Sequence, residues 1–341
     1  MDVAGLSVLV VNAGSTSLKL SVVDEDDSSV TVPSLAEASG DVAAVAHRVV
    51  HGGSRFREPV LIDDDVFGEL ERLSELAPLH NVPALKAIGE ARGLLPEVPQ
   101  VAVFDTAFHA TIPEVAFTYA LPCRWREEWG IRRYGFHGLS IAWAAERVPV
   151  PRLVVCHLGG GCSVTAVLNG RSVDTTMGFS PLEGVPMATR PGTIDPEILL
   201  YLQRHADAGP DELEQAHEHE SGLLALGGSA RVEELEASSE PRAQLALSVF
   251  SYRVAAAVAA MASALGGLDA LVFTAGVGEG SAFVREEVCG RLGFLGVELD
   301  SDENGRAEPD ATISAAGSPV QVRVVRARED IVAARAARDL I

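Results

Sequence analysis

Three stretches of the chain share one pattern of hydrophobic and polar positions, an apolar run followed by a cluster of small residues, at 8–24, 153–168 and 271–285. In the first two stretches the alternation of apolar and polar residues resumes after the cluster, which predicts a strand, a turn and a second strand. In the third stretch the glycines lead into a helix that Ser281 is placed to cap. The repetition predicts an internally duplicated α/β protein with a cleft between its halves.

Helical periodicity marks three further segments. Residues 66–77 and 83–93 are expected to form surface helices on either side of the segment P-L-H-N-V-P. Residues 242–265 are expected to form a long Ala-rich helix, because Pro241 suits its first turn and Gly266 suits its end.

Turn and loop signals separate these elements. Asn169 and Gly170 predict a hairpin turn, because both residue types tolerate positive φ. Residues 25–43 are acidic and Ser-rich and are expected to form a loop. Residues 177–197 form a long loop rich in Gly and Pro with Arg190 near its centre, and loops of this length in compact domains are often functional.

The charge balance narrows the possible partners. The 341 residues include 48 acidic and 27 basic side chains, a formal net charge of -21. This excess repels a phosphate backbone and an anionic membrane surface, so we expect neither nucleic acid nor membrane as a partner. The longest apolar span, at 254–265, is too short to cross a bilayer. Without a C-x-x-C pair among the four cysteines, free thiols in a soluble cytoplasmic protein are expected.

The first glycine-serine cluster is a candidate anion site. Side chains on a strand alternate in direction, so Ser15, Ser17 and Lys19 can project from one face while Leu18 and Leu20 point to the core. Hydroxyls, backbone amides and one ammonium suit a phosphate group. The segment is no Walker motif, because it lacks a G-K-[ST] ending on a helix. The alternative is a hairpin turn with a solvated lysine.

Two arginines are candidate anion ligands. Arg48 lies between His47 and His51 in an apolar stretch, and Arg190 lies in the long loop. A guanidinium cannot lose its charge and forks well onto phosphate or carboxylate oxygens. For Arg48 a structural salt bridge is the alternative.

Three further segments carry titratable groups. Asp105 follows the apolar run V-A-V-F, where a carboxylate at the end of a strand can hold Mg²⁺ or cap a turn. His137 lies between glycines and can donate to an anion, although a lone histidine is more often structural. The tract 217–220, H-E-H-E, lies in a polar run and is expected to be a solvated helix face.

Nine segments in order along the chain resemble the acetate kinase family. They are N-A-G-S-T-S-L-K, H-R-V-V-H-G-G, A-P-L-H-N, V-F-D-T-A-F-H, Y-G-F-H-G, C-H-L-G-G-G, M-G-F-S-P-L-E-G, T-R-P-G-T-I-D-P and F-T-A-G-V-G-E. The resemblance implies an α/β fold of two ribonuclease-H-like domains, as in actin-like ATPases, with a catalytic cleft between them. It implies an N-terminal domain of residues 1–107 plus 331–341, a C-terminal nucleotide-binding domain of residues 108–330, and a homodimer.

The resemblance also implies roles for individual residues. Asp105, Arg190 and His137 match catalytic positions, and Asn12 and Glu329 match metal-binding positions. The substrate positions are Arg48, Val50, Leu79, Phe136 and Pro181. The nucleotide and phosphate positions are Ser15, Ser17, Lys19, His157, Gly159, Gly160, Gly161, Gly276, Val277, Gly278, Glu279 and Gly280.

The implied reaction is reversible transfer of the γ-phosphoryl group of ATP to acetate or propionate, with Mg²⁺ or Mn²⁺, giving an acyl phosphate and ADP. A carboxylate is already a nucleophile, so the difficulty is to bring two anions together while charge spreads over the phosphoryl oxygens. Two arginines, a histidine and a divalent metal meet this difficulty by positioning and electrostatic stabilisation. Direct in-line transfer is therefore expected.

The chain departs from the family pattern at several positions. Gly160 replaces an asparagine, as in butyrate kinases, and Leu139 and Ile141 replace a threonine and a histidine. Arg231 lies near the place of an aspartate that contacts the nucleoside, and the region 24–44 is shorter than in the family. Gly160 leaves open a butyrate or branched-chain acyl kinase, and Arg231 leaves open a kinase that uses another nucleotide or pyrophosphate. A nucleotide or acyl-phosphate sensor without catalysis is the third alternative, because a fold alone does not determine a function.

Overall fold

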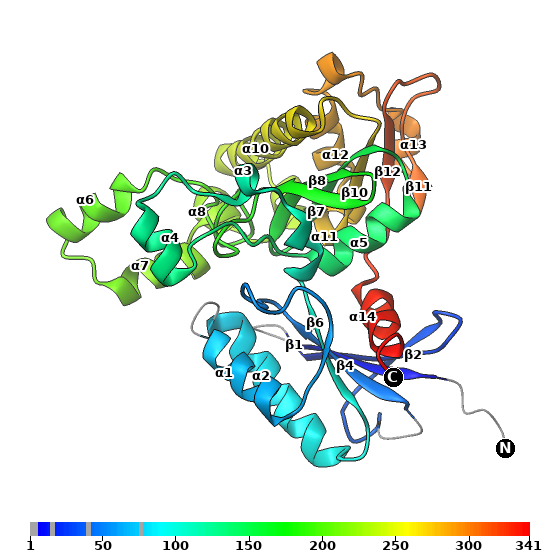
Figure 1. Ribbon diagram of the computed structural model, residues 1–341. Coiled ribbons are helices and arrows are strands. Elements are labelled where there is room, and N and C mark those ends of the chain that lie inside the picture. Colours follow the sequence, from blue (N-terminus) through cyan, green and yellow to red (C-terminus); the bar gives the residue numbers. More distant parts are fainter. Residues whose placement is uncertain (1–5, 14–17, 39–41, 75–77) are drawn as a thin grey trace. The chain divides into compact units, whose positions relative to one another are not determined.

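The computed structural model describes residues 6–13, 18–38, 42–74 and 78–341, without the side chains of 78–80. The chain divides into two compact units (Figure 1). The first unit comprises Met1–Ala110, Phe136–Trp143 and Arg328–Ile341, and the second comprises Thr111–Gly135 and Ala144–Ala327. The domain boundaries expected from the sequence stay predictions.

The first unit is built on a six-stranded mixed sheet. Its strands are β1 (Val8–Ala13), β2 (Leu18–Val23), β3 (Ser29–Val32), β4 (Ala44–Val49), β5 (Val60–Leu61) and β6 (Gln100–Phe104). They lie in the order β3-β2-β1-β4-β6-β5. The first three strands form an antiparallel meander, β1, β4 and β6 are parallel neighbours, and β5 closes one edge in antiparallel orientation.

The second unit repeats this topology. Its strands are β7 (Arg152–Leu158), β8 (Cys162–Leu168), β9 (Arg171–Thr175), β10 (Ala270–Thr274), β11 (Ala311–Thr312) and β12 (Gln321–Val324). Read from the other edge, their order β11-β12-β10-β7-β8-β9 is that of the first sheet. Again three antiparallel strands are followed by two parallel ones and a short antiparallel edge strand. The expected α/β fold with an internal duplication is confirmed.

Helices cover both faces of the first sheet. Helices α1 (Asp64–Leu73) and α2 (Pro78–Leu94) lie on one face, and α14 (Glu329–Arg338) lies on the other (Figure 1). Small residues let α2 approach β1 and β4 closely, because buried alanines at 84, 87 and 91 pack against the apolar side chains of these strands. On the opposite face the α14 residues Ile331, Ala333, Ala334 and Ala337 are buried.

Two sequence expectations for these helices are wrong. The segment P-L-H-N-V-P does not separate the helices, since α2 already begins at Pro78 and contains Pro83. The early start has a physical reason. The buried Asn81 side chain accepts from His51 N at 3.1 Å and donates to His51 O at 3.0 Å, which fixes the first turn. Helix α1 begins at Asp64 because the Asp63 side chain accepts from Val66 N, and it ends at Leu73 instead of residue 77.

A third expectation is also wrong, because strand β3 forms where a loop was predicted. It lies inside the region 25–43 that was expected to be a loop, and it pairs with β2 at the edge of the sheet. Its residues are mostly exposed, so the strand has no apolar face that a hydrophobic pattern would reveal. On β2 itself Leu20 is buried as expected, but Leu18 is 47% exposed and does not face the core.

The helices of the second unit surround its sheet. The long helix α10 (Pro241–Leu265) packs across β7, β8 and β9. The shorter ones are α3 (Glu114–Phe117), α4 (Cys123–Trp129), α6 (Glu197–His205), α7 (Pro210–His219), α8 (Gly222–Gly227), α9 (Val232–Glu236), α11 (Ala275–Gly280), α12 (Ala282–Cys289) and α13 (Ser301–Gly305). Helix α5 (Gly138–Arg147) begins in the first unit and ends in the second, and the 3-10 helices are η2 (Ala107–Thr111) and η3 (Gly293–Leu295).

Several local predictions in the second unit are confirmed. Asn169 and Gly170 take φ values of 48° and 78° between β8 and β9. The Ser281 hydroxyl accepts from Val284 N at 2.9 Å and so caps α12. Cys123 is exposed and the other three cysteines are buried, and all four are free thiols.

Helix α10 is the one helix among the described residues that is long and apolar enough to span a membrane. The expectation that the longest apolar span, at 254–265, is too short to cross a bilayer is therefore wrong, because this helix contains an 18-residue window that is sufficiently apolar. Half of its apolar window is buried inside the protein, and core helices of soluble proteins can have the same length and apolar composition.

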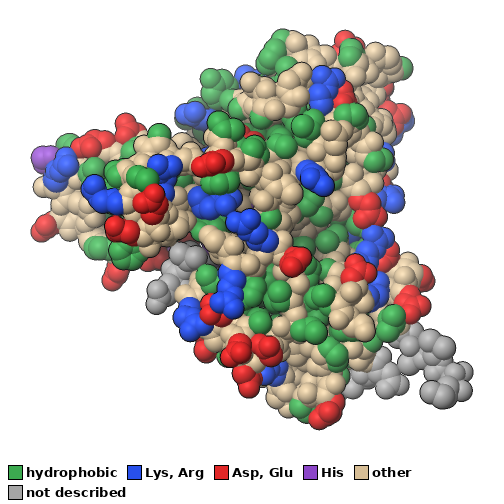
Figure 2. All heavy atoms as spheres, viewed as in Figure 1, with side chains coloured by type: hydrophobic (Ala, Val, Ile, Leu, Met, Phe, Trp, Pro, Cys, Tyr) green, Lys and Arg blue, Asp and Glu red, His purple; other side chains and the backbone are tan. Residues whose placement is uncertain are grey.

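On the molecular face shown in Figure 2, basic side chains lie interspersed with acidic ones.

Candidate active site

Polar side chains gather where three parallel strands of the first sheet end. Asn12 lies at the end of β1, Arg48 lies at the end of β4, and Asp105 directly follows β6. Asn12 and Arg48 are register partners across β1 and β4. Because the carboxyl ends of parallel strands meet at one edge of a sheet, the apolar runs that form these strands bring the three side chains together.

Arg48 is the centre of this cluster. Its Nε and Nη2 donate to the two carboxylate oxygens of Asp105 at 3.0 and 2.6 Å. Its Nη1 donates to Asn12 Oδ1 at 3.2 Å and lies 2.9 Å from Glu329 Oε2. Glu329 is the first residue of α14, so a helix from the end of the chain completes a group of side chains that comes from four elements. The arrangement brings together residues to which the family resemblance implies substrate, catalytic and metal roles.

The cluster holds one positive and two negative side chains in a largely buried place. Burial acts to lower the pKa of Arg48, but Asp105 and Glu329 outweigh it and hold this pKa above its ordinary value. Burial raises the pKa of Glu329, the Asp105 carboxylate adds to this effect, and Arg48 and Lys19 oppose it. The formal charge of minus one that remains is favourable for a cation.

The donor set fits a hard divalent cation. Asn12, Asp105 and Glu329 offer amide and carboxylate oxygens, which are the ligands that Mg²⁺ and Mn²⁺ prefer. Among the described residues no three His, Cys, Asp or Glu side chains form a group that would hold a metal ion by themselves. Mg²⁺ in phosphoryl-transfer sites is commonly bound by one or two carboxylates plus the substrate phosphates, so two carboxylates and an amide are sufficient.

The segment Y-G-F-H-G is held against the same strand end. Gly138 N donates to Asp105 O at 3.0 Å, and a Cβ at Gly138 would lie 2.1 Å from that oxygen. The buried His109 donates from Nε2 to Phe136 O at 2.8 Å, and His137 takes a φ of 61°. The glycine and the buried histidine thus place His137 beside Asp105. His109 belongs to the motif V-F-D-T-A-F-H, but its positioning role could not be read from that motif.

In the second unit two glycine-rich segments meet at the ends of β7 and β10, which are parallel neighbours. The segment 159–161 connects β7 to β8, and α11 follows β10 directly. A Cβ at Gly159 would lie 3.6 Å from the Cβ of Ala275, so the two segments are in contact. His157 lies at the end of β7 and is 8% exposed. The expected phosphate segment and the expected nucleotide segment are therefore side by side.

Arg190 is brought to the same region by the long loop. Ala188 N donates to Gly160 O at 3.3 Å, and Met187 N donates to Arg190 O at 2.9 Å. The Nε of Arg190 donates to Glu218 Oε2 at 2.7 Å. The expectation that the tract 217–220 is a solvated helix face is wrong for Glu218, because its side chain is 10% exposed and pairs with Arg190.

Two charged side chains hold the segment 275–280. Glu279 Oε1 accepts from Ala275 N at 3.0 Å and from Ala327 N at 2.8 Å. The fully buried Arg285 donates to Gly278 O at 3.0 Å and Glu279 O at 2.8 Å. The carboxylate of Glu279 thus bonds to the protein backbone, and together with Arg285 it fixes the conformation of this segment.

The expected acyl pocket is described in part. Val50 is half-buried, and Phe136 is 1% exposed with its ring 5.5 Å from that of His51. Pro181 is buried in the second unit. The side chain of Leu79 lies outside the described residues, as do Ser15 and Ser17. Lys19 is exposed and acts electrostatically on Glu329, so it belongs to the surroundings of the Arg48 cluster.

The departures from the family pattern have different surroundings. Leu139 and Ile141 are 6% and 0% exposed, so these apolar residues pack in the core. No atom lies within 4 Å of a Cβ placed at Gly160, so this position borders open space. Arg231 is 70% exposed and pairs with Glu234 at 3.3 Å.

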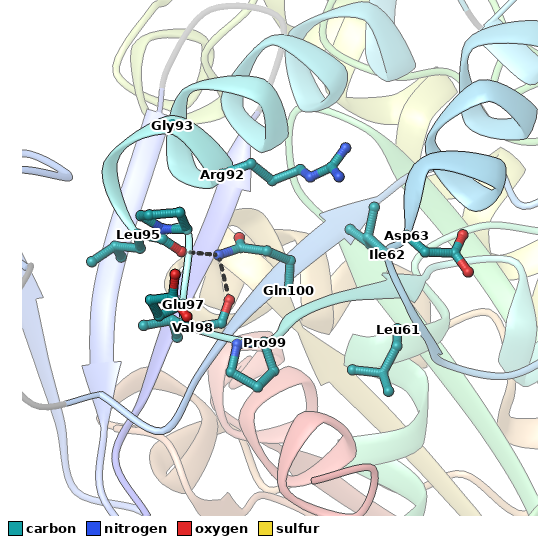
Figure 3. A pocket seen from close by; sticks show the side chains of 11 residues that line it. Leu61, Ile62, Asp63, Arg92, Gly93, Leu95, Glu97, Val98, Pro99 and Gln100 are labelled. Carbon is teal, nitrogen blue, oxygen red and sulfur yellow. Dashed lines mark hydrogen bonds between the residues drawn. The ribbon is translucent and has the colours of Figure 1, made fainter.

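A surface pocket of about 620 Å³ lies elsewhere on the first unit (Figure 3). It is lined by Arg92 and by Gln100, which begins β6, whereas Asp105 follows the other end of that strand. The Gln100 Nε2 donates to Leu95 O and Val98 O, and its Oε1 accepts from buried His47. The polar atoms of Gln100 are thus used internally, and the pocket lies apart from the cluster at the carboxyl ends of the strands.

Comparison with known protein families gives one clear match. The acetokinase family model matches residues 33–335. An acetate kinase of Shouchella clausii (strain KSM-K16) is 45% identical over 307 residues, which cover 86% of this chain and 78% of that protein. A propionate kinase of Citrobacter rodentium (strain ICC168) is 46% identical over 317 residues, which cover 89% and 77%.

Solved structures agree with these matches. A propionate kinase from Francisella tularensis subsp. tularensis SCHU S4 superposes with a TM-score of 0.92 at 32% identity, covering 98% of this chain and 100% of that one. An acetate kinase from Porphyromonas gingivalis superposes with a TM-score of 0.87 at 33% identity, covering 98% and 99%.

Proposed function

This chain belongs to the acetokinase family and is a phosphotransferase of that family, and from this premise we propose that it transfers the γ-phosphoryl group of ATP reversibly to acetate or propionate. The observation that carries the proposal is the cluster of Arg48 with Asp105, Glu329 and Asn12 at the strand ends. It combines a cation for an anionic substrate with oxygen ligands for a metal.

The arginines supply the electrostatic part of the reaction. We assign Arg48 to the acyl substrate and Arg190 to the phosphoryl group, whose oxygens carry more charge in the transition state. A well-placed arginine contributes about 10³–10⁵ in rate in related phosphoryl transfers. His137, placed beside Asp105, would donate a hydrogen bond to the same oxygens. The acyl carboxylate attacks phosphorus directly in line with the leaving diphosphate, without a phosphorylated enzyme side chain.

Asn12, Asp105 and Glu329 are the side chains that would hold Mg²⁺ or Mn²⁺. A bound divalent cation neutralises phosphate charge and orients the phosphate chain. Arg48 keeps both carboxylates close together in spite of their like charge, since it bonds to each of them. The backbone of 159–161 and of 276–280, together with Ser15, Ser17, Lys19 and His157, is assigned to the phosphates and the nucleoside.

The acceptor is assigned from the apolar residues of the substrate site. Val50, Leu79, Phe136 and Pro181 would leave room for a short aliphatic chain. One methylene group changes selectivity by about 1–3 kcal/mol, so acetate and propionate are both proposed. The relatives carry both names. A cytoplasmic homodimer with the two expected domains completes the proposal.

The test is acyl-phosphate formation trapped with hydroxylamine. Acetate, propionate and butyrate would each be offered with ATP, GTP or pyrophosphate in the presence of Mg²⁺. Product from acetate or propionate with ATP supports the proposal. Product from butyrate alone or pyrophosphate alone would keep the reaction class but replace the acceptor or donor. A folded protein that binds nucleotide and forms no product with any pair would be a sensor, and the proposal would fail.

A further inference from the structure

The end of α7 reaches Arg190. Glu218 lies in the last turn of this helix, and its Oε2 accepts from Arg190 Nε at 2.7 Å. The two side chains are only 10% and 16% exposed. An ion pair shielded in this way is weakened less by salt and water than a surface pair.

The backbone around Glu218 is also joined to the segment that carries Arg190. The Thr189 hydroxyl donates to Glu218 O at 2.6 Å, and Ser221 N donates to Thr189 O at 2.9 Å. Gly222 has a φ of 63°, and a Cβ there would lie 2.2 Å from Met187 O. The chain at 218–222 therefore packs directly on the chain at 187–190, and a side chain at 222 would separate them.

The other side of this segment contacts the glycine loop. Ala188 N donates to Gly160 O, so the residues before Arg190 lie between the loop 159–161 and the end of α7. A backbone fixed on both sides leaves the position of the guanidinium to the side-chain torsions of Arg190. The bond from Nε to Glu218 restricts these torsions.

We propose that Glu218 is a positioning residue for Arg190, and this proposal rests on the phosphoryl transfer proposed above. The carboxylate holds the guanidinium at its Nε edge and so orients the plane of its terminal amino groups. Catalysis of phosphoryl transfer depends on such pre-set donors, because a mobile arginine would have to be ordered in each transition state. Loss of Glu218 should therefore raise the free energy of the transition state more than it weakens substrate binding.

The experiment compares variants of the full-length protein. Glu218→Ala removes the acceptor of the Arg190 Nε hydrogen bond and is expected to lower kcat about 10-fold to 100-fold. Losses of this size are found when a side chain that hydrogen-bonds to a metal ligand, and so orients it, is removed. The KM for the acyl substrate should change less than about threefold. Glu218→Gln keeps an oxygen that accepts from Nε and should retain kcat within about threefold. Glu220→Ala is the control, because Glu220 is an exposed carboxylate two residues further along.

A second comparison separates positioning from a general effect on folding. In an Arg190→Lys background, which lacks Nε, Glu218→Ala should lower kcat less than about twofold, since residues that act through one another are not additive. An equal loss in both backgrounds, or a Glu218→Ala enzyme with wild-type kcat, would overturn the proposal.

The side-chain NMR signal of Arg190 gives a readout without turnover. The ¹⁵Nε–H resonance of Arg190, assigned by its absence in Arg190→Lys, should be protected from exchange in the wild type and in Glu220→Ala. It should broaden in Glu218→Ala, and an unchanged signal would again overturn the proposal. If the wild type forms no acyl phosphate, the proposed function is contradicted instead. The Arg190 resonance would then still show whether Glu218 holds the Nε–H group.

Discussion

At the scale of single residues, two glycines of the candidate site differ in what surrounds them. A methyl group at Gly138 would overlap the backbone oxygen of Asp105, whereas one at Gly160 would meet no atom within 4 Å. We expect Gly138→Ala to lower the free energy of unfolding by about 3 kcal/mol, because the overlap with backbone forces a shift. Gly160→Ala should change it by less than about 0.5 kcal/mol. Urea unfolding of both variants checks this, and equal losses would contradict it.

Two buried histidines predict acid sensitivity. Burial lowers the pKa of His47 and of His109 to about 4, against 6.5 in an unfolded chain. Between pH 6.5 and 4 the unfolded chain therefore binds more protons, so their stabilising contribution is complete above pH 6.5 and is lost as the pH falls toward 4. Each contributes about 2 kcal/mol to the loss between pH 7 and 5.

His47→Gln should remove one of these contributions while keeping a donor for Gln100. Urea unfolding at pH 7 and pH 5 should then show a loss smaller than that of the wild type by about 2 kcal/mol. His219→Gln, at an exposed position, serves as the control. If the two variants lose the same stability between these pH values, the pH argument is wrong for His47.

At the scale of elements, α11 depends on charged side chains that bond to its backbone. Glu279 accepts from Ala275 N and Ala327 N, and bonds to a charged group contribute about 1.5–3 kcal/mol. Glu279→Ala should therefore raise the KM for ATP about 10-fold while the KM for acetate changes little. Glu287→Ala is the matched control, because Glu287 lies in α12 and forms a partly exposed ion pair with Arg291. An unchanged KM for ATP would show that α11 keeps its conformation without the Glu279 carboxylate.

The sequence patterns correctly predicted the elements whose conformation depends on their own residues and not on contacts with distant segments. The apolar run before Asp105 forms a buried strand, so the position of that carboxylate at a strand end followed from the pattern. The Ala-rich helix α10 and the turn at Asn169 likewise depend on local chemistry. The chemistry of a guanidinium in an apolar stretch made Arg48 a candidate anion ligand, and the resemblance then added Glu329, which is far from Arg48 in the chain.

The elements that were missed depend on contacts between distant segments. Strand β3 is exposed and gains its structure from pairing with β2. Helix α2 extends through P-L-H-N-V-P because Asn81 bonds to the backbone of His51. Glu218 lies in a polar tract and becomes buried only because Arg190, 28 residues earlier, bonds to it. No local pattern of hydrophobic and polar residues contains this information.

At the scale of the whole molecule, the repeated sheet topology gives each half its own core, but the first half is completed by the end of the chain. Helix α14 covers β1 and β4, and its Ile331 and Ala334 are 2% and 0% exposed. The same helix delivers Glu329 to Arg48. The first unit should therefore require the last residues of the chain for both stability and function.

Truncation after Ala327 tests this dependence. Loss of α14 exposes the apolar face of β1 and β4 to water, at a cost of about 25 cal/mol for each Å². Amide hydrogen exchange in β1 and β4 should then increase strongly, while β7 and β10, which have their own helices, keep their protection. Truncation after Arg338 removes only exposed residues and should leave exchange unchanged. Protection of β1 that survives the longer truncation would mean that the first sheet folds without α14.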